Sequence, residues 1–267
     1  MRLGWIGQLW QQRELITRLT QREVQTRYRG SLVGWGWTIL TPLLMLTIYT
    51  FVFSSIFKAR WENTAELGSA GFALNIFTGM VVFGLFSECA TRAPSLITSN
   101  SNYVTKVRFP LETLGCTVVG NGLFHALTSL VILLVFRLIA TGSFPWSSIC
   151  LPLVWLPYIL LALAMTWILS ALGVYLRDLG QVVTVATSAL MFMSAVFYPL
   201  SALPERWAPL FKLNPIAWWI EETRALIVLN HWPRLDLVML QLAGAVLLCE
   251  LALRLFRKAS RGFADVL

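Results

Sequence analysis

The sequence has few charged residues for its length. Only 13% of the 267 residues are charged, whereas 57% are hydrophobic; a soluble domain carries roughly 25% charged residues. So little charge leaves too little polar surface to cover a water-soluble globule. The apolar residues also occur in blocks of about 20, the length of a helix that crosses a bilayer. The composition therefore excludes a soluble enzyme and predicts an all-α integral membrane protein.

The sequence also lacks the motifs of ATP hydrolysis and of metal or nucleophilic catalysis. A phosphate-binding loop needs Gly directly before its Lys, but every lysine here follows Phe, Thr or Arg. Neither histidine stands in an HExxH sequence, and no GxSxG nucleophile elbow occurs. We therefore expect no catalytic residue, no metal site and no cofactor bound by this chain.

Paired cysteines and a nucleic-acid-binding stripe are missing as well. Cys89, Cys116, Cys150 and Cys249 are scattered through apolar segments without paired spacing, which is typical of reduced residues within helices. The net charge of +8 comes from basic residues near the predicted membrane edges. Because these residues do not alternate with base-stacking aromatics in one stripe, we expect no nucleic-acid partner.

What the sequence does contain is long apolar segments. Six of them are predicted to cross the membrane as helices: residues 35–57, 72–97, 116–140, 151–176, 182–198 and 236–256. The loops between them are short. Residues 1–267 therefore form a single transmembrane domain with no room for a separate catalytic domain.

The segment before the first span, residues 1–34, predicts an amphipathic helix on the cytoplasmic membrane surface. Apolar residues recur at helical spacing, and arginines supply the polar face. The apolar set is Trp5, Ile6, Leu9, Trp10, Ile16 and Leu19, and the basic set is Arg13, Arg18, Arg22, Arg27 and Arg29. The segment has no short apolar core with a cleavage site, so we expect no cleavable signal peptide.

The distribution of basic residues sets the orientation. Cytoplasmic loops carry an excess of Lys and Arg. With the N-terminus inside, two thirds of the 21 Lys and Arg residues lie on the cytoplasmic side. The remaining third, which includes Arg137 and Arg224, is assigned to the outer side. The count predicts that both termini are cytoplasmic and that the number of spans is even.

Residues 200–234 are too polar to span the membrane and too apolar for an ordinary loop. Apolar and charged residues alternate at helical spacing on both sides of Asn214-Pro215, which divides the segment in two. We predict two short re-entrant helices that dip into the outer membrane face. An interfacial loop anchored by tryptophans is the alternative.

Three polar side chains within the spans are candidates for function. Glu88 and Arg92 stand four residues apart, the spacing of an ion pair on one helix face. The pair either gates the pathway or neutralises itself near the cytoplasmic end. His125 stands near Asn121 and either relays protons or makes a packing hydrogen bond.

Aromatic residues are frequent, and sugar rings stack on aromatic faces. The candidates for a substrate path are Trp37, Tyr49, Phe53, Phe192, Phe197 and Tyr198. The alternative is that these side chains form interfacial belts or pack between helices.

Four motifs in order resemble ABC-2 type permeases of the polysaccharide-export class and together cover nearly the whole chain. The first motif combines RYRGS at 27–31 with YTFVFSSIF at the end of the first span, 49–57. The second is NYVTKVRFPLE at 102–112, and the third is YLRDLGQVV at 175–183. The fourth runs from FYPLSALPERW to LNPIAWWIEETRALI within 197–227. The resemblance implies a bacterial inner-membrane protein with six spans, cytoplasmic termini and outward re-entrant helices.

The resemblance also implies the partners and the site. It implies a homodimer that binds two copies of a separate ATP-binding subunit, which uses ATP and Mg. A lipid-linked glycan passes through the dimer interface, surrounded by membrane lipids. The residues mapped onto the ATPase contact are Arg13, Arg18, Arg22, Arg27, Tyr28, Arg29, Val104, Lys106, Val107, Arg108, Phe109 and Pro110. Alternatively, Lys106 and Arg108 only satisfy the positive-inside rule.

Two other functional classes share some of these features. An ABC-2 exporter of a drug, antibiotic or small lipid has the same architecture and differs only in cargo. An ion-coupled flippase or membrane-embedded transferase would need several intramembrane carboxylates or a His with an acid partner, and the sequence offers neither. The resemblance of the four motifs therefore favours an ATP-driven polysaccharide exporter subunit over both alternatives.

Overall fold

The computed structural model describes residues 5–52, 61, 68–105, 109–200, 203, 205–206, 209, 211 and 213–267, and this part of the chain is helical without a β-strand. The α-helices are α1 (Trp5–Gln11), α2 (Arg13–Tyr28), α3 (Trp37–Phe51), α4 (Gly68–Arg92), α5 (Ser101–Thr105), α6 (Glu112–Thr141), α7 (Leu151–Tyr175), α8 (Leu179–Met193), α10 (Pro215–Ile227), α11 (Leu235–Ala259) and α12 (Phe263–Val266). Short 3-10 turns η1 (Gly34–Gly36), η4 (Thr98–Asn100), η5 (Trp146–Cys150) and η7 (Ser260–Gly262) connect some of them.

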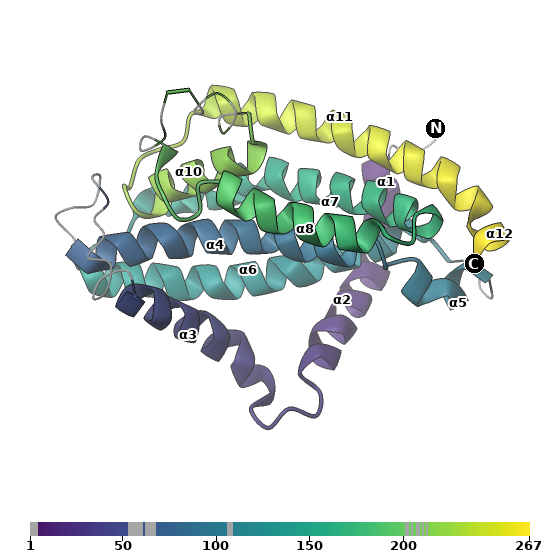
Figure 1. Ribbon diagram of the computed structural model, residues 1–267, viewed down its shortest axis with the longest axis horizontal. Coiled ribbons are helices and arrows are strands. Elements are labelled where there is room, and N and C mark those ends of the chain that lie inside the picture. The colour runs from purple at the N-terminus through teal and green to yellow at the C-terminus, as the bar shows by residue number, and fades with distance from the viewer. Residues whose placement is uncertain are drawn as a thin grey trace.

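Four long helices, α4, α6, α7 and α11, run side by side (Figure 1), with α4 against α6 and α7 against α11. Helices α1, α5 and α12 gather at one end of this bundle, which we call the terminal end, and α10 lies at the opposite end. Helices α2 and α3 form a V beside the bundle. The V turns at the elbow after α2, where Gly30 and Gly34 adopt φ of +83° and +53°, a conformation that glycine reaches at little cost.

Four described segments are long and apolar enough to cross a membrane: Ala70–Arg92, Glu112–Thr141, Trp146–Tyr175 and Leu235–Val266. They coincide with four of the predicted spans. The other two predicted spans, 35–57 and 182–198, contain α3 and α8, each 15 residues long. A 15-residue helix is about 22 Å long, shorter than the hydrocarbon core of about 30 Å. The count of six spans remains a prediction, and residues 53–57 lie outside the described residues.

Two predicted boundaries are wrong by about one turn, and proline explains both. The second predicted span ends at Ile97, but α4 ends at Arg92 because Pro94 disfavours helical geometry at the residue before it. The third predicted span begins at Cys116, but α6 begins at Glu112. Proline is favoured just before or at a helix start, and Pro110 stands directly ahead of this first turn.

The single amphipathic helix predicted within residues 1–34 is divided into α1 and α2 at Gln12. Its apolar residues do not share one buried face. Leu19 is buried and Leu9 packs against the core, whereas Ile6 and Trp10 are 59% and 68% exposed. The apolar periodicity therefore serves two surfaces, one towards the bundle and one away from it.

Buried aromatic side chains hold the bundle together and satisfy their polar atoms. Tyr158 is fully buried and its hydroxyl donates to the Val82 carbonyl at 2.5 Å, which joins α7 to α4. Trp155 donates to the Thr223 hydroxyl at 3.1 Å, which joins α7 to α10. In a medium of low dielectric such bonds are strong and leaving them unmade is costly.

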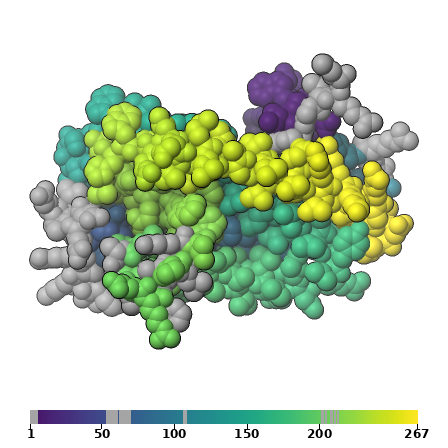
Figure 2. All heavy atoms as spheres, turned by 90° about the horizontal axis from the view of Figure 1, so that it is seen from above, coloured from purple at the N-terminus to yellow at the C-terminus, as the bar shows by residue number. Residues whose placement is uncertain are grey.

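The outer face of the bundle is apolar. In Figure 2 helix α11 forms a band along the whole upper face. Side chains of α11 that are 58–70% exposed include Leu235, Met239, Leu240, Leu247 and Leu255. A soluble monomer rarely exposes so large an apolar patch, whereas lipid tails cover it without cost. All four cysteines are free, and Cys89 and Cys249 are buried.

We expect Gly173→Ala to destabilise the bundle, because a methyl group at this position of α7 would lie 2.0 Å from the Pro94 carbonyl oxygen. Overpacking of this kind typically costs about 1–3 kcal/mol. The measurement is the midpoint of thermal unfolding in detergent. Gly244→Ala in α11 is the control, since no neighbouring atom lies within 4 Å of the place that its methyl group would take. Equal midpoints for the two variants would contradict the close approach.

Candidate functional site

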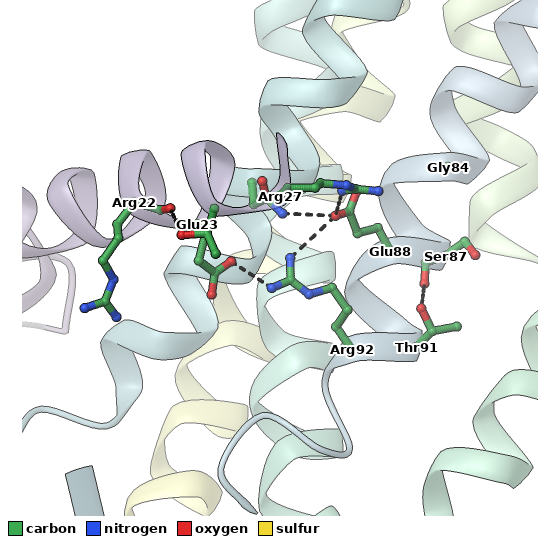
Figure 3. Close-up of a pocket in the computed structure, with 10 residues that line it drawn as sticks. Arg22, Glu23, Arg27, Gly84, Ser87, Glu88, Thr91 and Arg92 are labelled. Carbon is green, nitrogen blue, oxygen red and sulfur yellow. Dashed lines mark hydrogen bonds and ion pairs between the residues drawn. The ribbon is translucent and has the colours of Figure 1, made fainter. Parts of the chain in front are cut away.

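Helix α2 is fastened to α4 and α6 by a cluster of charges around Glu88, shown in Figure 3. One carboxylate oxygen of Glu88 accepts from Arg27 at 2.6 Å, from Asn121 at 3.1 Å and from Arg92 at 3.5 Å. Arg92 also donates to the Glu23 carboxylate at 2.8 Å. Two of these residues belong to α2, two to α4 and one to α6, so the cluster joins three helices.

The geometry changes the role assigned to Glu88 and Arg92. The sequence suggested an ion pair within one helix, yet their direct contact is the longest in the cluster. Each residue makes a shorter bond to α2, with Glu88 accepting from Arg27 and Arg92 donating to Glu23. An isolated exposed pair contributes only about 0–1 kcal/mol. The Glu88 side chain is only 16% exposed, so its bonds are screened less by solvent.

A second contact between α2 and the bundle is made by Tyr28, the residue after Arg27. The Tyr28 hydroxyl lies 3.2 Å from Nδ1 of His125, and the two rings pack edge to face. Burial raises the pKa of the Tyr28 hydroxyl, so the phenol stays protonated while it shares this hydrogen bond with the imidazole. His125 thus makes a hydrogen bond between two helices, and the choice between a packing role and a proton relay stays a prediction.

Two adjoining cavities lie along this junction, and we call them together the α2 cleft. Their volumes are about 740 and 460 Å³, and both are lined by Arg27 and Glu88. The larger cavity is also lined by Arg22, Glu23, Ser87, Thr91, Arg92 and Asn121. The smaller one reaches Trp37 at the start of α3. Most of the side chains that line the cleft are therefore polar, although α4 and α6, which carry two of its walls, are otherwise apolar.

The remaining residues mapped onto an ATPase contact divide into four groups. Arg13, Arg18 and Arg29 are exposed. Val104 and Phe109 pack against the core, and Phe109 stacks on Tyr103 with ring centroids 4.4 Å apart. The Pro110 carbonyl accepts from Thr113 at the start of α6. Lys106, Val107 and Arg108 lie outside the described residues.

The aromatic residues predicted to line a path do not form one row. Phe192 and Phe197 have ring centroids 5.7 Å apart, and the Tyr198 hydroxyl donates to the Phe192 carbonyl. Tyr49 and Phe197 pack against the same small apolar cluster. Trp37 stands apart from all of them, at the α2 cleft, where it donates to Ser31 at 2.9 Å. Phe53 lies outside the described residues.

Two buried arginines at the α10 end were missed by the sequence reasoning, which counted both as charges of the outer side. Arg224 of α10 is 2% exposed and donates to the carbonyls of Asn75 and Val196, at 3.0 and 2.8 Å, and to Glu221 at 2.9 Å. It therefore ties α10 to α4 and to the segment after α8. Its guanidinium also lies 4.7 Å from the Trp61 ring.

Arg137 of α6 is 7% exposed and holds the other end of α10. It donates to the carbonyls of Ile227 and Val228, at 3.2 and 3.5 Å, and to Ser143. A cation at the C-terminus of a helix satisfies orphan carbonyls and opposes the helix dipole. No sequence signal marks the two partners on α10 and directly after it, because they are backbone carbonyls about 90 residues away.

The fold and this site define a class of protein, the helical membrane protein with a charged N-terminal helix docked on its bundle. The chain belongs to the ABC-2 type transporter family, whose family model matches residues 14–228. The match contains the α2 cleft and α10, and it ends before α11.

Three relatives extend the comparison to nearly the full chain. The O-antigen export system permease protein RfbA of Myxococcus xanthus is 31% identical over 97% of this chain and 98% of its own length. The RfbA permease of Klebsiella pneumoniae is 23% identical over 95% of each chain. The capsule polysaccharide export inner-membrane protein CtrC of Neisseria meningitidis serogroup B is 25% identical over 92% of this chain and 89% of its own.

We expect Glu88→Gln to loosen α2 from the bundle, because the amide carries no charge for Arg27 and Arg92. Hydrogen bonds to charged groups contribute about 1.5–3 kcal/mol, so the free energy of local opening of α2 should fall by about 1–2 kcal/mol. Amide hydrogen exchange of residues 13–28 measures it. Arg18→Gln, at an exposed position of α2, should leave exchange unchanged. Unaltered exchange in the Glu88 variant would contradict the docking.

We expect Arg224→Gln to lower the free energy of unfolding by about 2 kcal/mol, because the carbonyls of Asn75 and Val196 lose a charged donor, and a hydrogen bond to a charged group contributes about 1.5–3 kcal/mol. Unfolding in detergent with increasing denaturant gives the value. The control is Arg234→Gln. The side chains of Arg234 and Asp236, which form an ion pair, are 70% and 68% exposed, so this pair contributes little to the free energy of unfolding. Similar losses in both variants would argue against a specific anchor.

Proposed function

We propose that this chain is the membrane-spanning subunit of an ATP-driven exporter that moves a polysaccharide out across the bacterial cytoplasmic membrane. The observation that carries the proposal is similarity over almost the whole chain to permeases named for O-antigen and capsule polysaccharide export. Membership of the ABC-2 family implies that the ATP-binding subunit is a separate chain. That subunit would use ATP and Mg, and this chain would supply the path.

The proposed contact with the ATPase is formed by α2 and the segment 102–110. Arg22 of α2 donates to the Tyr103 hydroxyl of α5 at 3.2 Å, so the two elements touch. A force applied to either element would therefore reach the other. Exposed Arg13, Arg18 and Arg29, together with Lys106 and Arg108, would meet acidic groups of the ATPase.

The proposed topology has six spans, with both termini in the cytoplasm. Helices α3 and α8 are the two additional spans, and α10 belongs to a re-entrant segment at the outer face. The burial of Arg137 and Arg224 supports this orientation, because it removes two cations from the outer loops and strengthens the positive-inside bias. Asn214 accepts from the Ile216 amide at 3.0 Å, which starts α10 sharply at the predicted break.

A homodimer is the proposed assembly, with the path between the two copies. Helices α3 and α8 each have only two buried residues. Their exposed apolar side chains include Ile39, Ile48, Phe51, Val182, Val185 and Phe192, at 49–70% exposure. A second copy would cover these surfaces. Phe192, Phe197 and Tyr198 would then offer aromatic faces to a lipid-linked glycan.

The test is ATP hydrolysis by the complete transporter. The chain is purified with its ATP-binding partner, reconstituted in vesicles of membrane lipids, and supplied with lipid-linked glycan extracted from the producing cell. We expect the glycan to stimulate hydrolysis severalfold and to appear on the far side of the vesicle. Stimulation by a small drug or simple lipid, and none by the glycan, would favour the alternative cargo and contradict the proposal.

A further inference from the structure

The C-terminal end of α11 lies against the start of α6. Helix α11 follows residue 228, where the match to the family model ends. Arg257 of α11 donates to the Glu112 carboxylate at 2.8 Å. The Glu112 side chain is 16% exposed and that of Arg257 is 37% exposed. This ion pair joins two helices at positions that are 145 residues apart in the sequence.

Glu112 sits where the segment 102–110 becomes a membrane helix. It is the first residue of α6, two positions after Pro110, and a carboxylate in the first turn is favoured by the helix dipole. Its carbonyl accepts from the indole of Trp167 at 2.9 Å, and Trp167 is fully buried in α7. Glu112 is therefore fixed through its backbone by α7 and through its side chain by α11.

The tail after Arg257 folds back as part of the core. Phe263 is fully buried between Phe256 and Tyr175, with ring centroids 5.8 and 6.0 Å apart. The Tyr175 hydroxyl donates to the Ala259 carbonyl at 2.9 Å. Helix α12 contacts α5, and Figure 1 shows them together at the terminal end. The C-terminal tail thus braces the same helix, α5, that α2 contacts through Arg22 and Tyr103.

We propose that Arg257 is a positioning residue that fixes the C-terminal end of the ATPase-contact segment through its ion pair with Glu112. The proposal rests on the proposed function, since it assumes that residues 102–110 meet the ATPase. When ATP binding displaces that segment, the fixed junction transmits the displacement to α6. Without the pair, the segment moves against a loose helix start and hydrolysis no longer drives transport efficiently.

The experiment measures glycan exported per ATP hydrolysed in the reconstituted complex. The variants are Arg257→Gln, Glu112→Gln and both together. Coupling between two sites typically corresponds to about 5–150-fold, and we expect each single variant to lower the ratio about tenfold. The double variant should be no worse than either single one, because both remove the same contact. The KM for ATP should not change, since ATP binds in the partner. Arg257→Lys should restore part of the ratio.

The matched control is Arg254→Gln, less than one turn earlier in α11. Arg254 is 73% exposed, and among the residues that the structure describes it pairs with Glu250 of its own helix, at 2.6 Å. The Arg254→Gln variant should export as much glycan per ATP hydrolysed as the unsubstituted complex. Equal export per ATP in the Arg257→Gln and Arg254→Gln variants would overturn the proposal. Additive losses in the double variant of Arg257 and Glu112 would also overturn it. So would an Arg257→Gln variant that unfolds at a lower temperature but exports as much glycan per ATP as the unsubstituted complex. If the unsubstituted complex exports no glycan, the proposed function fails instead.

Discussion

A charge inside a membrane bundle has to find its partners within the protein, and this constraint organises the whole chain. The Glu88 carboxylate is the clearest case, because one of its oxygens accepts from Arg27, Arg92 and Asn121. The Glu88 side chain is only 16% exposed, so solvent offers little replacement for these donors. The constraint turns α2, a helix that by its pattern could lie free on the membrane surface, into part of the bundle.

The same constraint acts at both ends of the bundle with different partners. At the terminal end, carboxylates pair with arginines from distant helices, as in Glu112 with Arg257. At the α10 end, Arg137 bonds to backbone carbonyls and a hydroxyl. Ion pairs between distant helices transmit a displacement from one helix to the other, whereas the bonds of Arg137 to buried carbonyls hold one short helix in place. The terminal end is therefore suited to respond to a partner, and α10 is suited to stay in place.

Much of the fold follows from local sequence, but the site follows only in part. Long apolar blocks predict the four long helices because length and hydropathy are local properties. The i, i+4 spacing predicts that Glu88 and Arg92 are near each other. It cannot predict Arg27 as the closest partner of Glu88, since 61 residues separate them. Arg224 looks like a loop charge because its acceptors are carbonyls, which carry no side-chain signature.

The ion pairs between α2 and α4 predict that the two helices move as one body when the proposed ATP-binding partner hydrolyses ATP. Spin labels at Gln25 in α2 and Thr91 in α4, both exposed, would report this directly in the reconstituted complex. The account predicts one narrow distance distribution that is the same without nucleotide and with ATP trapped. A distribution that broadens or shifts on ATP binding would show that α2 moves independently of α4, and it would contradict the account.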